Sequence, residues 1–230
     1  MVSKKVGIAY ILILMECPKC KGTGFIDKGG VVELCSCRYE GVNLQKYLNI
    51  PPRFINAEFE NYMPISPSQK TALEICLHYA HSFDPKEGKG LTLVGPPSMG
   101  KTHLAVATLK NIYRLKRVRG FFFDTKDLFY RLQSYAGSDK MNKLMNFLIN
   151  VPLLVLDDLG SERLSDWRVE VLSYIISTRY NYLKSTIITT NYPLLKREEE
   201  GQSLEERLSP AIVSKIYQMN DLINISSLAK

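Results

Sequence analysis

No apolar stretch of this sequence is long enough to cross a membrane. The longest uninterrupted apolar stretch, residues 6–15, has ten residues, whereas a membrane-spanning helix needs about 20. It follows Lys4 and Lys5 and so resembles the start of a signal peptide, but no small-residue cleavage site comes after it. We therefore expect a cytoplasmic protein with no membrane partner. Two interpretations of residues 1–14 are open: they are a native part of the chain, or, as their odd composition suggests, an upstream extension before a true initiator at Met15.

Internal repeats are also absent, so a repeat architecture is excluded. With 230 residues and 45% hydrophobic content, the chain is neither disordered nor fibrous, and it can bury one good-sized core beside a small extra module. Composition predicts a module rich in Cys, Gly and Lys at residues 15–48, a proline-rich linker at 49–68 and a larger domain at 69–230.

Acidic residues are missing from residues 101–120, which carry six Lys or Arg. The whole chain has a net charge of +7 and a pI near 9.1, which favours an anionic partner. Two interpretations of the basic run remain open. It is either a surface for a nucleic-acid backbone or the solvated face of a helix.

Cysteine is scarce, and four of the five cysteines form a C-x2-C and a C-x-C pair separated by fourteen residues. Two close pairs of thiolates match tetrahedral Zn²⁺, which would replace a core in so short a module. These residues are Cys17, Cys20, Cys35 and Cys37. Two disulfides or four free thiols are the alternatives, and disulfides conflict with a reducing cytoplasm. We expect the fifth, Cys76, to be a core residue of a helix at residues 69–81.

Strands and helices alternate in the larger domain, which predicts an α/β fold with a five-stranded parallel sheet covered on both faces. The predicted strands are residues 91–94, 120–124, 153–157, 186–190 and 222–226. Ligands of such sheets bind at the carboxyl edge of the strands. The prolines near residue 51 predict an extended linker, in which Phe54 and Phe59 either cover a nucleotide base or pack against the domain.

The first of these strands runs into a glycine loop of the form G-x-x-x-x-G-K-T, followed by a helix over residues 103–109. Such a loop directs unpaired backbone N–H groups and the positive end of a helix dipole into one concavity, which binds phosphates. Lys101 would reach the β- and γ-phosphates of ATP, and the Thr102 hydroxyl would ligate Mg²⁺. The predicted nucleotide-binding residues are Gly95, Pro96, Pro97, Ser98, Met99, Gly100, Lys101, Thr102 and His103.

Polar side chains end the third and fourth predicted strands, and they would meet the loop at the same edge of the sheet. Asp157 would hold Mg²⁺ opposite Thr102, largely through water, and Asp158 would orient the attacking water. Asn191 would contact both the γ-phosphate and that water. One alternative is that the two carboxylates merely cap the turn that follows the strand. The other is that Asn191 merely forms a turn before Tyr192 and Pro193.

In this order, these motifs resemble the AAA+ ATPases and, among them, the bacterial replicative-helicase loaders of the DnaC and DnaI type, which are related to IstB. The resemblance spans residues 15–226. Its motifs are residues 95–102, the Asp-Asp-Leu-Gly ending of residues 153–160, residues 189–191 and 204–208, the linker residues 50–54, and the amino-terminal Cys-Pro-x-Cys-x-Gly-Thr-Gly-Phe.

The resemblance implies a loader that binds the replicative helicase through the cysteine module, and ATP and single-stranded DNA through the ATPase domain. Such domains assemble into a helical or ring-like oligomer, in which an arginine completes the neighbour's site. Lys215 stands at that position here, and Arg207 is the alternative. Lysine is a point charge and lacks the planar fork of arginine, so the resemblance does not carry assisted hydrolysis across the interface over to this chain.

Two further features bear on mechanism. Asp158 stands where most AAA+ proteins have Glu, which implies slow hydrolysis of ATP to ADP and phosphate. The chain ends at Lys230, directly after the last predicted strand, and we expect no helical lid.

For DNA, the resemblance points to an inserted helix pair at residues 126–148. Its aromatic rings can stack on bases and its cations can neutralise phosphates, which favours binding of single-stranded DNA. They are Tyr130, Arg131, Tyr135, Lys140 and Lys143.

Other possible functions are a transposition helper ATPase similar to IstB, a nucleotide-gated adaptor with negligible hydrolysis, and a small-molecule kinase, which would leave the cysteine module without a role.

Overall fold

A five-stranded parallel sheet forms the centre of the molecule, in the strand order β4-β5-β6-β3-β7. The computed structural model describes residues 19, 25–27, 29–30, 32–34, 44–161, 165–196 and 201–226. The strands are β3 (Gly90–Val94), β4 (Gly120–Asp124), β5 (Leu153–Asp157), β6 (Ser185–Thr190) and β7 (Asn220–Asn224). The predicted fold class is confirmed, with strand boundaries shifted by two residues or fewer.

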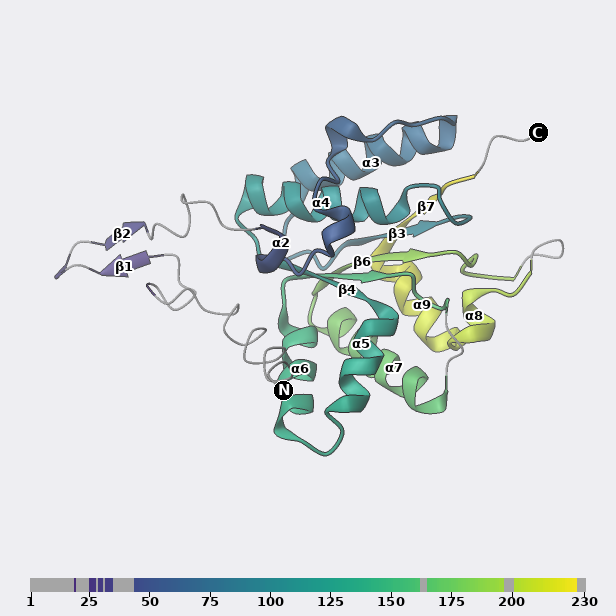
Figure 1. The fold of residues 1–230 in the computed structure, drawn as a ribbon. Helices are drawn as coiled ribbons and strands as arrows, with labels where there is room; N and C mark the ends of the chain where they lie inside the picture. Colours follow the sequence, from purple (N-terminus) through teal and green to yellow (C-terminus); the bar gives the residue numbers. More distant parts are fainter. Residues whose placement is uncertain are drawn as a thin grey trace, which may run out of the picture.

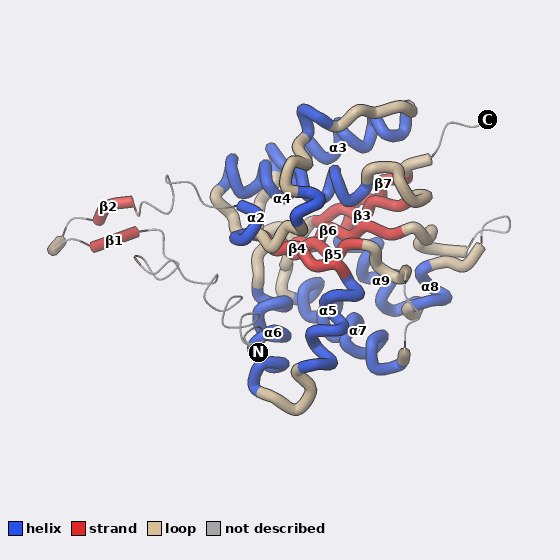
Figure 2. The backbone as a smooth tube through the Cα atoms, in the orientation of Figure 1, coloured by secondary structure: helices blue, strands red, loops and turns tan. Residues whose placement is uncertain are grey.

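Helices cover both faces of this sheet, as the views in Figures 1 and 2 show. One face carries α3 (Pro67–Ser82) and α4 (Lys101–Lys116). The other carries α5 (Thr125–Ser134), α6 (Asp139–Asn150), α7 (Asp166–Asn181), the short α8 (Leu204–Arg207) and α9 (Pro210–Met219). The helix pair expected between the second and third strands is therefore α5 and α6.

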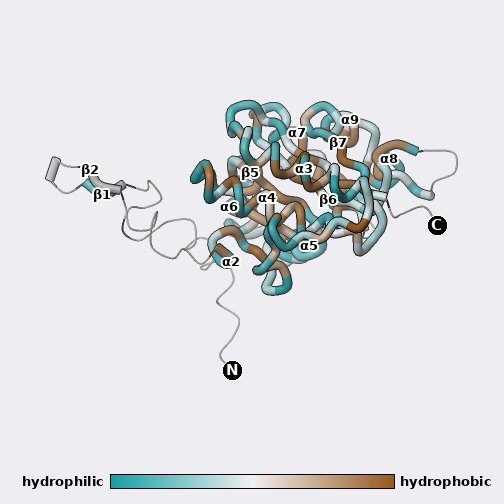
Figure 3. The backbone as a smooth tube through the Cα atoms, turned by 90° about the horizontal axis from the view of Figure 1, so that it is seen from above, coloured by the Kyte–Doolittle hydropathy of each residue, from teal (hydrophilic) through white to brown (hydrophobic). Residues whose placement is uncertain are grey.

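Alternate residues of the strands pack into two separate hydrophobic clusters. In β5, Leu153 and Val155 pack with α3 and α4, whereas Leu154 and Leu156 pack with α5, α6, α7 and α9. Because both faces are buried, β5 is apolar along its whole length up to Asp157. Hydrophobic residues accordingly concentrate on the strands and the inner sides of the helices, and the peripheral turns are hydrophilic (Figure 3).

The register of the strands brings their polar ends to one edge. Asp124 at the end of β4 pairs with Asp157 at the end of β5, and Val94 of β3 pairs with Thr190 of β6. Parallel strands all end at the same edge of a sheet, so the loop after β3 and the residues after β5 and β6 lie together there.

The linker before the domain is not extended throughout. It contains the 3-10 turns η2 (Pro52–Phe54) and η3 (Phe59–Asn61), and the short helix α2 (Leu44–Tyr47) precedes it. The prediction of an extended linker was wrong at Pro52 because a proline at the start of a helix loses no hydrogen bond. Phe59 is buried in the core and Phe54 packs against it, which confirms the packing alternative for both rings.

Most of the basic run at residues 101–120 is engaged within the domain. Lys110 is buried, donates to Ile55 O and Ala57 O, and forms an ion pair with Glu58. Arg114 forms two hydrogen bonds with the same carboxylate, at 2.7 and 2.8 Å. These cations hold the linker on α4, so neither the nucleic-acid surface nor the solvated face describes them.

The described amino-terminal residues form an antiparallel hairpin of β1 (Phe25–Asp27) and β2 (Val32–Leu34). Its turn contains Gly29 and Gly30 at positive φ, a conformation that glycine adopts without steric cost. The four paired cysteines, and with them the predicted zinc site, lie outside the described residues, as do residues 1–14. Residues 227–230 also lie outside them, so the expectation that no helical lid follows the last strand stays a prediction. Cys76 is fully buried in α3, as predicted.

None of the described helices combines the length and the apolar character that crossing a membrane requires.

Candidate nucleotide-binding site

The loop between β3 and α4 has the backbone geometry of a phosphate-binding loop. Gly95, Ser98 and Gly100 all have positive φ, and Gly100 is the residue from which α4 begins. A Cβ atom on Gly95 would lie 2.0 Å from the carbonyl oxygen of Ile225, and one on Gly100 would lie 2.5 Å from the ring of Tyr62. Only glycine therefore fits at these two positions, and the helix amino terminus stays open toward the loop.

Lys101 lies across this loop. Its Nζ donates hydrogen bonds to Gly95 O and Pro96 O, both at 2.7 Å, and to Asn191 Oδ1 at 2.9 Å. Burial lowers the pKa of Lys101, while the nearby carboxylates of Asp158 and Asp157 oppose that shift. The ammonium group is thus placed between the loop and the two strand-end carboxylates.

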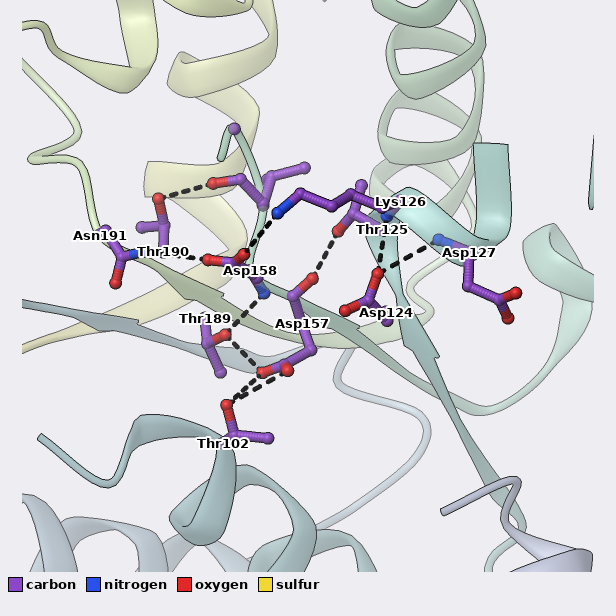
Figure 4. Close-up of polar contacts among 12 residues, drawn as sticks. Thr102, Asp124, Thr125, Lys126, Asp127, Asp157, Asp158, Thr189, Thr190 and Asn191 are labelled. Carbon is purple, nitrogen blue, oxygen red and sulfur yellow. Dashed lines mark hydrogen bonds and ion pairs between the residues drawn. The ribbon is translucent and has the colours of Figure 1, made fainter. Parts of the chain in front are cut away.

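Thr102 and Asp157 face each other where α4 begins and β5 ends (Figure 4). Thr102 Oγ1 donates to Asp157 Oδ1 at 2.9 Å. Burial raises the pKa of Asp157 to about 6, against the hydrogen bonds from Thr189 and Thr102, which lower it. A hydroxyl beside a carboxylate is a hard-oxygen donor set that fits Mg²⁺.

Two protein ligands would leave the remaining coordination positions of Mg²⁺ to phosphate and water, as is usual for this ion. Within the described residues, no group of three or more His, Cys, Asp or Glu side chains converges on a metal position. A dedicated all-protein cage is therefore not part of this site.

Asp158 and Asn191 are joined directly. Asn191 Nδ2 donates to Asp158 Oδ1 at 2.9 Å, while Asn191 Oδ1 accepts from Lys101. The other carboxylate oxygen of Asp158 lies 3.5 Å from the ammonium of Lys126 on α5. The structure therefore brings together every strand-end residue that the sequence placed in the site, and their catalytic roles stay predictions.

Three threonines that sequence reasoning missed hold this arrangement in place. The buried Thr189 donates to Asp157 Oδ1 at 2.6 Å and accepts from the backbone N–H of Asp158 at 2.9 Å. Thr125 donates to Asp157 O, and Thr190 donates to Leu159 O. Asp158 has a φ of 57°, a conformation that surrounding contacts must support in a residue other than glycine. The Thr189-Thr190-Asn191 run was the available signal, although only its asparagine was singled out.

The linker and α3 also contact the loop, through one residue each that the sequence did not reveal. Tyr62 Oη and Gln69 Nε2 both donate to Met99 O, at 3.1 and 3.3 Å. Burial raises the pKa of Tyr62 to about 12, which keeps its hydroxyl a donor. The predicted ligand His103 forms a hydrogen bond with Glu58 O through Nε2 and packs edge-on against Tyr62.

The two candidates for a neighbour's site both have partners within the domain. Lys215 lies on α9 and donates to Ser177 Oγ on α7 at 2.6 Å. Arg207 lies on α8, donates to Gly160 O and stacks on Tyr192. A role for either residue in a neighbouring subunit stays a prediction.

A glycine loop with Lys101 and Thr102, set beside Asp157, Asp158 and Asn191 at the edge of a five-stranded parallel sheet, defines an ATP-binding protein of the AAA+ type. Residues 79–227 match the family model described as IstB-like ATP binding protein. The chain belongs to this family and is related to the DnaC and DnaI helicase loaders.

Three relatives illustrate the relationship. A crystal structure of the DnaC helicase loader is 53% identical, with a TM-score of 0.69, over 76% of this chain and 99% of that one. The replicative helicase loader DnaC of Escherichia coli strain K12 is 28% identical over 162 residues, which are 69% of this chain and 64% of that protein. The loader DnaI of Bacillus subtilis is 24% identical over 152 residues, 65% of this chain and 49% of that protein. The chain thus spans about half to two thirds of the length of these curated relatives.

Proposed function

We propose that this protein is an ATP-hydrolysing helicase loader, which binds the replicative DNA helicase and single-stranded DNA during the initiation of replication in the cytoplasm. The observation that carries the proposal is the line of contacts from Lys101 through Asn191 to Asp158, beside the Thr102–Asp157 pair. The similarity to DnaC loaders supports the choice of helicase and DNA as partners.

Each residue has a defined part in the proposed reaction. Lys101 and the backbone N–H groups of the loop bind the phosphates of ATP. Thr102 and Asp157 would hold Mg²⁺, which would neutralise negative charge on the phosphates. Asp158 orients the attacking water, and Asn191 aligns Asp158 with Lys101, since its amide contacts both.

Steady-state ATPase measurements, with and without single-stranded DNA, test the enzymatic part. We expect slow hydrolysis that falls to background in Lys101→Ala, because phosphate binding is lost, and in Asp158→Asn, because the amide cannot take up a proton from water. Nucleotide affinity should survive in Asp158→Asn only. A wild-type protein that binds ATP without hydrolysing it would instead indicate a nucleotide-gated adaptor.

We propose that α5 and α6 bind single-stranded DNA. Tyr130 is 73% exposed, and Lys140 lies 6.0 Å from the ring centroid of Tyr135. Arg131 and Lys143 each form an ion pair with an aspartate one turn earlier. Exposed rings flanked by cations stack bases and neutralise phosphates. A Tyr130→Ala variant should weaken DNA binding at every salt concentration, whereas Lys140→Ala should also flatten its salt dependence.

We propose that residues 15–48 form a zinc module that contacts the helicase. Cys17, Cys20, Cys35 and Cys37 would supply four thiolates. Metal analysis of the purified chain should find one zinc per protein, lost in a Cys17→Ser, Cys20→Ser variant. Retention of the replicative helicase by the full chain, and its loss when residues 15–43 are removed so that the core residues from Leu44 onward are kept, would support this role. A full-length protein that retains no helicase would contradict the loader assignment.

A second candidate is a transposition helper ATPase similar to IstB, the protein after which the matching family model is described. Both candidates share the nucleotide site, so hydrolysis does not separate them. Their partners do: a loader retains the replicative helicase, whereas a transposition helper retains a transposase on double-stranded DNA. We also propose self-association into a helical or ring-like oligomer, with Lys215 near the neighbour's nucleotide.

A further inference from the structure

Arg207 contacts the turn that directly follows the two catalytic-site aspartates. Its Nε donates to Gly160 O at 2.5 Å, and its Nη1 donates to Gln202 Oε1 at 2.7 Å. The guanidinium carbon lies 4.5 Å from the ring centroid of Tyr192. The side chain is half-buried, and its planar group is therefore held by a hydrogen bond on one side and an aromatic ring on the other.

These contacts connect two turns whose relative position sets the distance between Asp158 and Asn191. One turn follows β5 and carries Asp158, and the other follows β6 and carries Asn191. The turns already meet through Asn191 Nδ2 and Asp158 Oδ1 at 2.9 Å, and through Thr190 Oγ1 and Leu159 O at 2.7 Å. Arg207 adds a third connection on the side of α8, because it bonds to the first turn and stacks on the second.

The backbone of α8 fits closely against the same two turns. The amides of Leu204 and Glu205 donate to Pro193 O and Leu194 O, at 2.7 and 3.1 Å. Gly160 has a φ of 84°, and a Cβ atom there would lie 2.6 Å from the side chain of Leu204. The helix is thus seated on the turn, and Arg207 projects from it toward Gly160 O.

We propose that Arg207 is a positioning residue for ATP hydrolysis in its own chain, and not the arginine that completes a neighbour's site. It holds the Asp158 turn against the Asn191 turn, so that the carboxylate stays aligned with the water it orients. Arginine suits this position because its Nε–H lies in the plane of a group that also stacks on Tyr192, whereas lysine offers neither feature. The inference rests on the proposed ATPase function.

A mixing experiment separates action within a chain from action on a neighbour. Arg207→Ala has an intact phosphate loop, and Lys101→Ala has an intact Arg207. If Arg207 acted in a neighbour's site, an equal mixture would recover about a quarter of the wild-type rate, since about one interface in four would join a working loop to a working arginine. We expect no recovery. Recovery would overturn the proposal, and co-purification of a tagged Lys101→Ala chain establishes that mixed assemblies form.

Hydrogen exchange gives a readout that does not depend on turnover. In monomeric Arg207→Ala, the amides of residues 158–161 and 190–194 should exchange faster than in the wild-type chain, with those of α3 unchanged as an internal reference. Unchanged exchange in both turns would overturn the proposal. If the wild-type chain hydrolyses no ATP, the proposed function fails, and the exchange result still decides whether Arg207 holds the turns.

Conservative variants add a third test. Arg207→Gln keeps an N–H donor for Gly160 O but no charge, whereas Arg207→Lys keeps the charge without the planar group. Positioning predicts that the glutamine variant retains more kcat than the lysine variant, with the KM for ATP within about twofold of wild type in both. The reverse order would favour a charge acting on phosphate. Thermal melts of both variants confirm folding, and Arg207→Gln remains informative if Arg207→Ala does not fold.

Discussion

At the scale of single residues, the chemistry of the site depends on hydroxyl groups as much as on charges. Thr189 is 1% exposed, so water does not reach its hydroxyl. Its single hydroxyl both donates to the carboxylate proposed to hold Mg²⁺ and accepts from the backbone of the residue proposed to orient water. A valine of the same shape would break both contacts and leave Asp158 unsupported at positive φ.

We therefore expect Thr189→Val to lower kcat by about 10- to 100-fold, since small misplacements of reacting groups carry losses of that size. Thr189→Ser should recover most of the rate because it restores the hydroxyl. Thr108→Val is a matched control, as Thr108 is equally buried but bonds to Leu104 O within α4 and to Cys76 on α3, and not to Asp157 or Asp158. Equal losses in the Val and Ser variants would show that packing, and not the hydroxyl, matters at residue 189.

The raised pKa of Asp157 predicts how stability depends on pH. Its pKa rises from 3.8 to about 6 on folding, so the folded state binds more protons than the unfolded state between these values. Without Mg²⁺, the free energy of unfolding should therefore decrease as pH rises through this window, by at most about 3 kcal/mol. Asp157→Asn should remove this decrease. Denaturant melts at pH 4 to 7.5 measure it, and a parallel pH profile in the two proteins would contradict the assigned pKa.

At the scale of elements, one buried arginine connects three segments at the edge of the sheet opposite the nucleotide site. Arg179 on α7 is fully buried, and burial lowers its pKa to about 9. It donates to the carbonyls of Leu148, Val151 and Ser185 and to the hydroxyl of Thr186. The end of α6 and the start of β6 are thereby fixed on α7.

Replacing Arg179 with methionine would leave three buried carbonyl groups without these donors. We expect Arg179→Met to lower the free energy of unfolding by about 3 to 5 kcal/mol, the usual effect of breaking a buried charged network. Arg53→Met, at an exposed linker position, should change it by less than about 0.5 kcal/mol. Urea melts of both variants test this, and a small effect at residue 179 would mean that water replaces the lost donors.

At the scale of the whole molecule, the described residues place the entire hydrophobic core after residue 43. Both clusters are built from residues 44–225, with Leu48 and Ile50 the earliest buried members. Lys110, Arg114 and Glu58 hold the linker on this core. The described residues before 44 add nothing to either cluster.

A chain that begins at residue 44 should therefore fold and bind ATP with the affinity of the full chain. Its melting temperature should fall by no more than a few degrees, because no described core contact is removed. A second truncation, beginning at residue 64, removes Tyr62, Glu58 and Phe59 and should be markedly less stable. Loss of folding in the first truncation would show that the module is part of the domain.

Much of the fold and of the site was predictable because it is encoded locally. The glycine loop, the apolar run ending in Asp157, and Asn191 after the next strand are short-range patterns, and parallel strands must end at one edge. The contacts that the linker and α3 make with the phosphate loop were not predictable in this way. Tyr62 and Gln69 reach Met99 across 30 or more positions of sequence, and no periodicity marks such a pairing.

The sequence by itself determined the class of fold, the order of the strand-end residues and the nature of the phosphate loop, because periodicity and spacing depend on neighbours along the chain. Only the tertiary structure decided how the chain's charges are used. It places Lys110 and Arg114 on Glu58, and Arg207 on Gly160 and Tyr192. Such pairings follow from the packing of distant elements, in which a charge is neutralised or hydrogen-bonded by whichever group the fold brings to it.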